Sequence, residues 1–201
     1  MERVNRFEQL SCDKALEQLK DGNARYVSGQ ATSNNEPAGI RADLATKGQF
    51  PFAVILGCAD SRVPPEVVFD VGVGQIFVVR TAGNIADSVA VGSIEYAVEH
   101  LKARLIVVLG HDKCGAVQAA INGGDLGPNI GAIVNEIKPS VDKLEANRDA
   151  DDFLHQCEDE NIINQAKKLN ESAILGKYVN DGTLKIVGAK YMLATGEVNF
   201  F

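Results

Sequence analysis

Three short apolar runs in the first part of the chain are typical of strands that are buried on both faces. They cover residues 52–56, 75–80 and 105–110, and each is rich in Val, Ile, Leu or Phe. Between the second and third runs, apolar residues recur at helical spacing and predict a helix over residues 87–102. Strand, helix and strand in this order predict a right-handed crossover, and therefore a parallel sheet.

The two ends of the chain have different patterns, which predict a helix and a hairpin. Residues 11–29 begin with Ser11 as an N-cap and place apolar residues at helical spacing, which predicts a helix with one apolar side. The polar segment 30–39 breaks this periodicity, so we expect a loop that lets the first helix stand away from the body of the protein. Residues 184–201 predict a strand that turns back as a hairpin. Further helices are expected over residues 115–121, 130–144 and 152–175.

No repeat, low-complexity tract or change of composition divides the chain. Its 201 residues are 45% hydrophobic and 23% charged, which is ordinary for one globular domain. We therefore expect a single α/β domain over residues 1–201, with a mostly parallel sheet flanked by helices. Within it, residues 1–40 would form an N-terminal helical arm, residues 50–201 the α/β core, and the last residues a hairpin strand.

The charge balance and the apolar content exclude several kinds of partner. Lys and Arg number 20 against 27 Asp and Glu, which gives a net charge of −7, and no basic stripe offers a site for nucleic acid. No apolar run approaches the ~20 residues of a membrane span, and residues 1–10 lack the pattern of a signal peptide. We therefore expect a cytoplasmic protein that binds neither nucleic acid nor membrane. In that compartment the four cysteines would be reduced thiols rather than a disulfide framework: Cys12, Cys58, Cys114 and Cys157.

Residue types that bind metals follow two of the predicted strands. Cys58 comes directly after the first strand, and His111 and Cys114 follow the third. Because the carboxyl ends of parallel strands meet at one edge of a sheet, these side chains converge if the two strands are neighbours. Two thiolates and an imidazole suit Zn²⁺, and three protein ligands leave the fourth tetrahedral position open, as in catalytic sites. Asp60 is close enough in sequence to close that position.

The sequence excludes some other interpretations of these residues and leaves others open. A buried Cys is often only a small apolar residue, and a His at a strand end is often only hydrogen-bonded. A phosphatase loop would need Arg six positions after Cys58, where Pro64 stands, and neither Cys-x-x-Cys nor Gly-x-Gly-x-x-G follows the first strand. Asp60 and Arg62 could form a bidentate pair that keeps the carboxylate ionised. The plainer interpretation of that pair is a turn with a surface ion pair.

Taken together, these motifs resemble those of the β-class carbonic anhydrases. The resemblance covers essentially the whole chain, from the first helix to the terminal hairpin. It implies one α/β domain that catalyses the reversible hydration of CO₂ to bicarbonate and a proton, with one Zn²⁺ per subunit. The motifs that carry it are Cys58-Ala-Asp60-Ser-Arg62-Val-Pro-Pro-Glu66, Phe77-Val-Val-Arg80-Thr-Ala-Gly83-Asn84 and His111-Asp-Lys-Cys114-Gly115.

The resemblance implies a role for individual residues of this chain. Cys58, His111 and Cys114 would hold the zinc. Asp60 and Arg62 would form the catalytic dyad that orients zinc-bound hydroxide for attack on CO₂. The positions that match the substrate pocket of the family are Gln49, which would hydrogen-bond the substrate, Phe77, Tyr96 and the amide of Gly115.

Some positions distinguish two forms of this family. In one form the aspartate ligates zinc at low pH, and bicarbonate fills an inhibitory pocket built partly from a Trp three residues before the first Cys. Here that position is Ile55 and the chain has no Trp, so we expect the open form, with Asp60 paired to Arg62. Thr81 departs from an asparagine that is common in the family. His100 matches a proton shuttle proposed in some relatives, although an exposed His near a helix end is the commoner case.

Two other functions and a range of assemblies stay open at this point. Some members of the family hydrolyse CS₂ or COS with the same zinc ligands, and a zinc-stabilised domain could serve only in binding. Core packing is the alternative for Phe77 and Tyr96. The resemblance also implies a homodimer or homotetramer, in which the N-terminal arm clasps the partner and the two sheets join across the two-fold axis.

Overall fold

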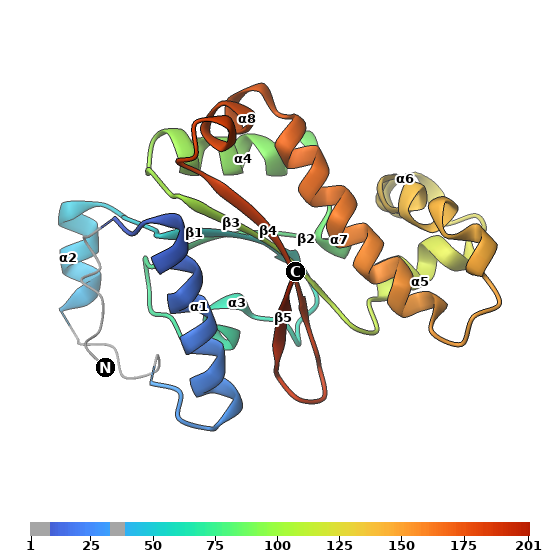
Figure 1. Ribbon diagram of the computed structural model, residues 1–201, viewed down its shortest axis with the longest axis horizontal. Coiled ribbons are helices and arrows are strands. Elements are labelled where there is room, and N and C mark those ends of the chain that lie inside the picture. Colours follow the sequence, from blue (N-terminus) through green and yellow to red (C-terminus); the bar gives the residue numbers. More distant parts are fainter. Residues whose placement is uncertain (1–8, 33–38) are drawn as a thin grey trace.

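A five-stranded sheet forms the centre of the computed structural model, which describes residues 9–32 and 39–201 (Figure 1). The strand order is β2-β1-β3-β4-β5, with parallel pairing throughout except for the antiparallel pair of β4 and β5. This is the α/β fold with a mostly parallel sheet and a C-terminal hairpin strand that the sequence predicts. The strands are β1 (Ala53–Cys58), β2 (Ile76–Thr81), β3 (Leu105–His111), β4 (Lys185–Tyr191) and β5 (Val198–Phe200).

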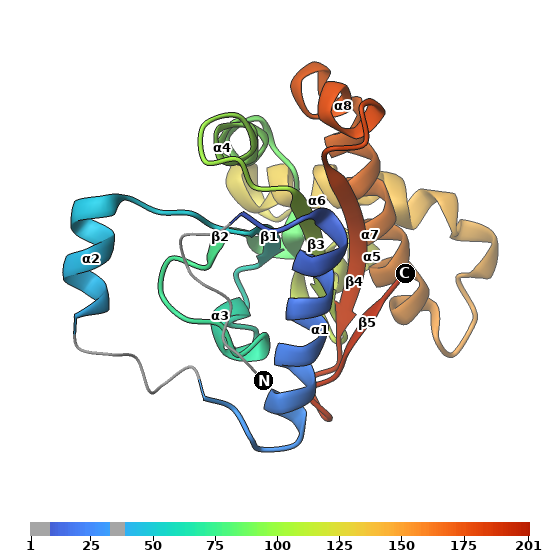
Figure 2. The ribbon, with the colours of Figure 1, turned by 60° about the vertical axis from the view of Figure 1, so that its left-hand side comes forward.

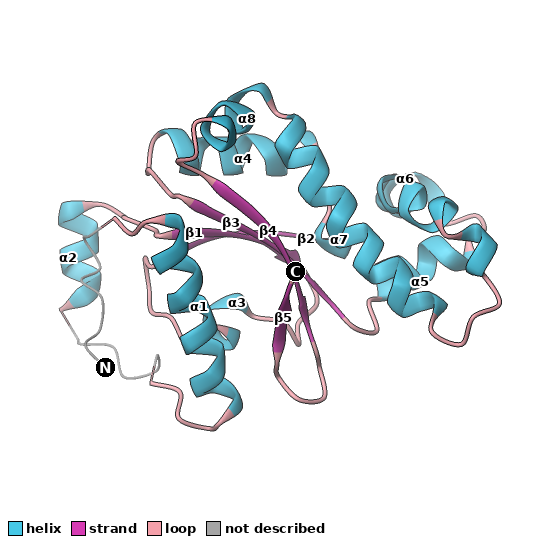
Figure 3. Ribbon diagram, viewed as in Figure 1, coloured by secondary structure: helices cyan, strands magenta, loops and turns pink. Residues whose placement is uncertain are grey.

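Helices cover both faces of this sheet, as Figure 3 shows. The apolar side chains of β1 and β3 alternate between the two faces. On each face they form an apolar cluster with the helices that cover it. On one face lie α1 (Cys12–Val27) and α3 (Pro65–Val68), and on the other lie α4 (Ser88–Glu99), α7 (Phe153–Glu171) and α8 (Ala173–Asn180). Burial on both faces explains why β1 and β3 read as continuous apolar runs.

A third apolar cluster lies beyond the carboxyl edge of the sheet. The helices α5 (Gly115–Asn122) and α6 (Gly127–Lys143) pack there against the first half of α7 (Figure 1). Cys58 and Cys114 belong to this cluster. The helices therefore close over the place where β1 and β3 end.

The first helix does not stand away from the body, so that expectation was wrong. The apolar side of α1 packs on the sheet of its own chain, where Ala15 and Leu19 are fully buried. The side chain of Asn23 donates to the carbonyls of Val68 and Gly196, which ties α1 to α3 and to the hairpin. Figure 2 shows α1 beside β4 and β5. The expectation failed because the pattern identified an apolar helix face but not the surface of the same chain that buries it.

Two short helices were not expected from the sequence. They are α2 (Ile40–Lys47), which has no buried residue and lies apart from the sheet in Figure 2, and α3. The predicted helix 152–175 is instead two helices, because Ser172 adopts an extended backbone and its Oγ caps α8 at the amide of Leu175. Part of the predicted loop, residues 33–38, lies outside the described residues. Among the residues that are described, no helix is long and apolar enough to span a membrane.

Candidate metal centre

Three side chains converge where β1 and β3 end, because these strands are parallel neighbours. Cys58 is the last residue of β1, His111 is the last residue of β3, and Cys114 is the N-cap of α5. Their ligand atoms all lie within 4.8 Å of one another, and all three residues are buried. The sequence predicts this convergence if the two strands are neighbours. In the structure they are neighbours, and the side chains converge.

The imidazole of His111 is held in the form that binds a metal. Its Nδ1 lies 2.8 Å from the carbonyl oxygen of Asp112. Because a carbonyl only accepts, Nδ1 is the donor, and whenever the ring is neutral Nε2 keeps the lone pair that a metal needs. Nε2 is buried and has no hydrogen-bond partner among the described residues. A buried nitrogen without a partner, beside two thiols, is the donor set that a Zn²⁺ ion satisfies.

The two thiols share a hydrogen bond that sets their charge. Contacts with the Cys114 thiol, with His111 and with the backbone amides of Gly83 and Asp60 lower the pKa of Cys58 to about 4, against the effect of burial. The contact with Cys58, together with burial, raises the pKa of Cys114, although the amides of Ala116 and Val117 act in the opposite direction. Without a metal the pair therefore carries one negative charge. A divalent cation would deprotonate both thiols.

The loop after β2 supports Cys58 through Gly83, a residue that the sequence analysis names only as part of a motif. The amide of Gly83 lies 3.4 Å from Cys58 Sγ. Gly83 has φ 72°, and a Cβ at this position would lie 2.6 Å from Ile137 Cδ1. Only glycine therefore lets this amide reach the thiolate without strain. The signal in the sequence was a glycine two residues after a strand, without any indication of what its amide would contact.

Arg80 stabilises the backbone between Cys58 and Asp60 with two hydrogen bonds. Its Nε donates to the carbonyl of Cys58 at 2.8 Å, and its Nη2 donates to the carbonyl of Asp60 at 2.5 Å. These bonds cross from β2 to the turn that follows β1. They hold the turn in the shape that presents the Asp60 carboxylate to the metal ligands.

Asp60 and Arg62 form the bidentate pair that the sequence suggests. Arg62 Nε lies 2.9 Å from Oδ1 and Arg62 Nη2 lies 2.7 Å from Oδ2, and the backbone amide of Arg62 also donates to Oδ1. These bonds lower the pKa of Asp60 to about 2. Oδ2 lies 3.8 Å from His111 Nε2, so an ionised carboxylate borders the cluster.

Gly115 is next to the ligand cluster, whereas the other remaining residues predicted for the site lie away from it. Gly115 begins α5 directly after Cys114. Phe77 pairs with Val54, whereas Cys58 pairs with Thr81, so four residues, or roughly 13 Å along the strand, separate Phe77 from the register of Cys58.

Gln49, Tyr96 and His100 also lie toward the amino edge of the sheet. Gln49 is exposed in the loop that precedes β1. Tyr96 is 50% exposed, and its ring lies 5.0 Å from the ring of His100. Because α4 runs from the end of β2 to the start of β3, its last turn lies near the amino edge. The fold of one chain therefore brings together Cys58, Cys114, His111, Asp60, Arg62 and Gly115. The other predicted residues lie away from them.

The fold and the cluster define an α/β protein with a buried Cys₂His cluster, which could hold a metal ion, at the carboxyl edge of its sheet. The family model described as carbonic anhydrase matches residues 53–198. The chain is 45% identical to Carbonic anhydrase 2 of Mycobacterium tuberculosis over 187 residues, which are 90% of this chain and 89% of the relative. It is 44% identical to the carbonic anhydrase of Mycolicibacterium smegmatis over 191 residues, with 92% and 90% covered.

Solved structures agree with these relatives. The β-carbonic anhydrase CcaA superposes with a TM-score of 0.73 at 26% identity, with 92% of this chain and 94% of that chain covered. The Coccomyxa β-carbonic anhydrase in complex with acetazolamide gives a TM-score of 0.77 at 27% identity, with 92% and 86% covered. The chain therefore belongs to the β-carbonic anhydrase family and is an enzyme of that class.

Proposed function

We propose that this carbonic anhydrase hydrates CO₂ reversibly to bicarbonate and a proton at one Zn²⁺ ion held by Cys58 Sγ, His111 Nε2 and Cys114 Sγ. One observation carries the proposal: the three ligand atoms lie within 4.8 Å of one another. The ionised Asp60 carboxylate, 3.8 Å from His111 Nε2, supports it. When bound, Zn²⁺ supplies the Lewis acidity that makes water nucleophilic at neutral pH.

In this proposal Asp60 orients the attacking water and is not a metal ligand. Both carboxylate oxygens accept hydrogen bonds from Arg62, which fixes their direction and keeps the group ionised. An ionised carboxylate accepts a hydrogen bond from the attacking water and so aims the lone pair of its oxygen at the carbon of CO₂. The oxygen adds to that carbon, bicarbonate leaves, and the proton passes to buffer. The amide of Gly115, next to Cys114, is a donor in reach of bicarbonate.

The substrate side of the pocket would come from a second copy of the chain. Gln49, Phe77 and Tyr96 lie away from the cluster of their own chain, and Gln49 and Tyr96 are exposed. The strand β2 is at one edge of the sheet, where another sheet can be added. The β-carbonic anhydrases of Sordaria macrospora, which have the same fold, are described as tetrameric. We therefore propose a homodimer or homotetramer in which these residues face the cluster of the partner.

Zinc content and CO₂ hydration test the proposed reaction together. We expect one zinc per chain, hydration measured by stopped-flow pH change from pH 6 to 9, and inhibition by acetazolamide, which is bound in the Coccomyxa structure. Activity that persists at the low end of this range supports the open form. A zinc-loaded, folded protein that hydrates CO₂ no faster than buffer would refute the proposal. The same preparation tested with CS₂ and COS decides whether those substrates are turned over.

Mixing two impaired variants tests the shared pocket. Gln49→Ala keeps the metal ligands and Cys114→Ser keeps Gln49, so a mixed dimer contains one complete site if Gln49 acts across the interface. We expect activity to rise above that of both parents after the variants are unfolded and refolded together. Activity no higher than the average of the parents would place Gln49 in its own subunit's site or outside any site.

A further inference from the structure

A row of buried polar side chains on α7 faces the loop after β2 and the backbone of Cys114. Glu158, Asn161 and Gln165 are spaced three and four residues apart, so they share one face of the helix. All three are almost completely buried. Asn161 donates to the carbonyl of Gly83 at 2.9 Å, and Gln165 accepts from the amide of Ala86 at 2.8 Å. This face of α7 therefore contacts the loop that supports Cys58.

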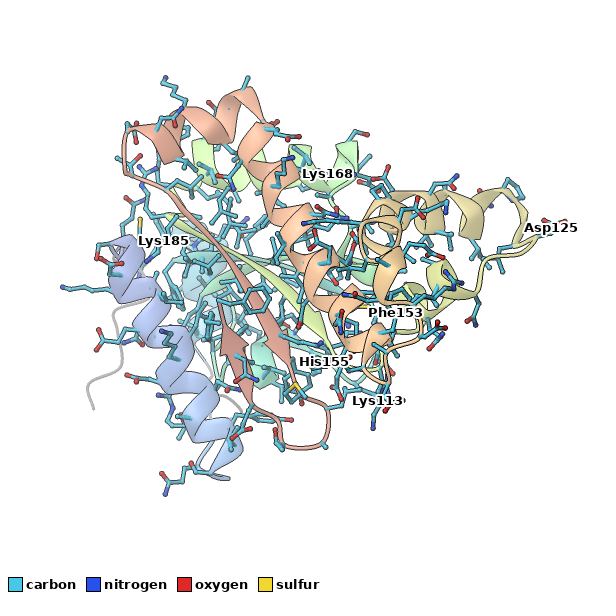
Figure 4. The ribbon with its side chains drawn as sticks, turned by 45° about the vertical axis from the view of Figure 1, so that its right-hand side comes forward. Lys113, Asp125, Phe153, His155, Lys168 and Lys185 are labelled. Carbon is cyan, nitrogen blue, oxygen red and sulfur yellow. The ribbon has the colours of Figure 1, made fainter. Side chains whose placement is uncertain are left out.

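Glu158 is the member of this row that reaches a metal ligand directly. Its Oε1 accepts the backbone amide of Cys114 at 3.0 Å. Its Oε2 lies 2.9 Å from Lys190 Nζ, on β4, and both side chains are buried. Lys190 also contacts Asp159 and His155, and His155 lies on the first turn of α7 (Figure 4).

The buried pair of Glu158 and Lys190 is better explained by the metal site than by stability. Burying two opposite charges costs desolvation energy, and apolar residues of similar volume are often as stable. A carboxylate beside two thiolates would also repel them. Lys190 neutralises that charge while leaving Oε1 as a strong acceptor for the Cys114 amide. Glu158 thus supplies an acceptor next to the thiolates, and Lys190, which also pairs with Asp159, offsets its charge.

We propose that Glu158 is a positioning residue of the metal site, which fixes Cys114 through its backbone amide in the geometry that binds Zn²⁺. The inference rests on the zinc site proposed above. Glu158 contacts neither substrate nor the reacting atoms. It acts on the second thiolate, and Lys190 holds its carboxylate in place.

Glu158→Met removes the acceptor while keeping a side chain of similar length. Partners of metal ligands typically contribute 10- to 100-fold to metal affinity, so we expect the Zn²⁺ dissociation constant to rise by that factor. The measurement is competition with a chromophoric chelator. The cobalt-substituted protein gives a second readout, because its thiolate-to-metal absorption band shifts when the geometry at Cys114 changes.

Glu160→Met is the matched control. Glu160 lies on the same helix, is also buried, and pairs with Lys143 of α6 at 2.6 Å. In the described part of the chain it makes no hydrogen bond to either ligand loop. We expect this variant to lose stability but to keep the zinc affinity and the cobalt spectrum of the unaltered protein.

Glu158→Gln keeps an acceptor but removes its charge. Charge-assisted hydrogen bonds are roughly twice as strong as neutral ones, so we expect about a 3- to 10-fold loss of zinc affinity, between the unaltered protein and Glu158→Met. If Glu158→Met does not fold, the zinc affinity of Glu158→Gln, compared with that of the control Glu160→Gln, tests the role of Glu158. Zinc affinities and cobalt spectra that match those of the controls overturn the role of Glu158. If the unaltered protein binds no zinc, the proposed function itself fails, so the two failures are distinguishable.

Discussion

The carboxyl and amino edges of the parallel sheet differ in whether one chain alone brings the predicted site residues together there. At the carboxyl edge, Cys58, Cys114, His111 and Asp60 are held by hydrogen bonds from four segments of the same chain, which are β2, the loop after it, the turn after β3 and α7. At the amino edge, Gln49 is exposed in a loop, and Tyr96 and His100 contact each other on the surface. The candidate metal ligands are therefore brought together by the folding of one chain, whereas the proposed substrate pocket would need association of two chains.

The largest expected effect is the loss of the metal in Cys114→Ser. A serine hydroxyl is a poor zinc ligand, so we expect less than a tenth of the normal zinc content and a loss of hydration of at least roughly 10³-fold. Metal analysis after dialysis and stopped-flow hydration measure both. Cys157→Ser is the control, because Cys157 is also buried but lies outside the ligand cluster. Full zinc occupancy in Cys114→Ser would remove this residue from the metal site.

Asp60→Asn separates metal binding from orientation at the same edge. The amide is nearly the same size but carries no charge, so we expect normal zinc content and a loss of hydration of about 10²- to 10³-fold. Stopped-flow hydration and metal analysis on the same sample give both values. Wild-type activity in this variant would show that Asp60 has no part in orienting the nucleophile.

Gly83→Ala tests how the loop after β2 supports Cys58. The new Cβ would meet Ile137, and alanine at this positive φ is strained, so we expect roughly 2–3 kcal/mol of destabilisation and weaker zinc binding. Thermal unfolding with and without zinc measures this effect. In the control Gly131→Ala, on α6, nothing lies within 4 Å of the added Cβ. Equal melting temperatures for the two variants would contradict the role of Gly83.

The smallest effect is expected at the amino edge, for Gln49→Ala. One hydrogen bond to substrate contributes about 1 kcal/mol, so we expect roughly a fivefold loss of hydration. Because Gln49 is exposed in its own chain, zinc content and melting temperature of the subunit should not change. A fall in zinc content would mean that the two edges are not independent.

The sheet and the metal ligands were largely predictable because their signals are local. The buried runs become β1, β2 and β3 within about two residues, and the motif spacing places Cys58, His111 and Cys114 at strand ends. The resemblance to β-carbonic anhydrases is confirmed by the relatives. The roles of Asp60 and Arg62 stay predictions, although the pair itself is present.

Other features were not predictable because they depend on contacts between distant segments. The surface that buries α1 is formed by strands and by α3, which come later in the chain. Glu158 contacts Cys114 across 44 residues of sequence, and Glu160, two residues later, has the same residue type without that contact. No pattern within α7 distinguishes them. The direction of each side chain follows only from how α7 packs against β3 and β4.

The central position of β3 has a consequence for synthesis of the chain. All three ligands are present once residue 114 has left the ribosome, but β4, which pairs with the second edge of β3, is complete only at residue 191. In the interval, the nascent chain exposes an unpaired apolar edge, which is prone to aggregation. The edge of β3 that β4 covers therefore stays unpaired until β4 has been made.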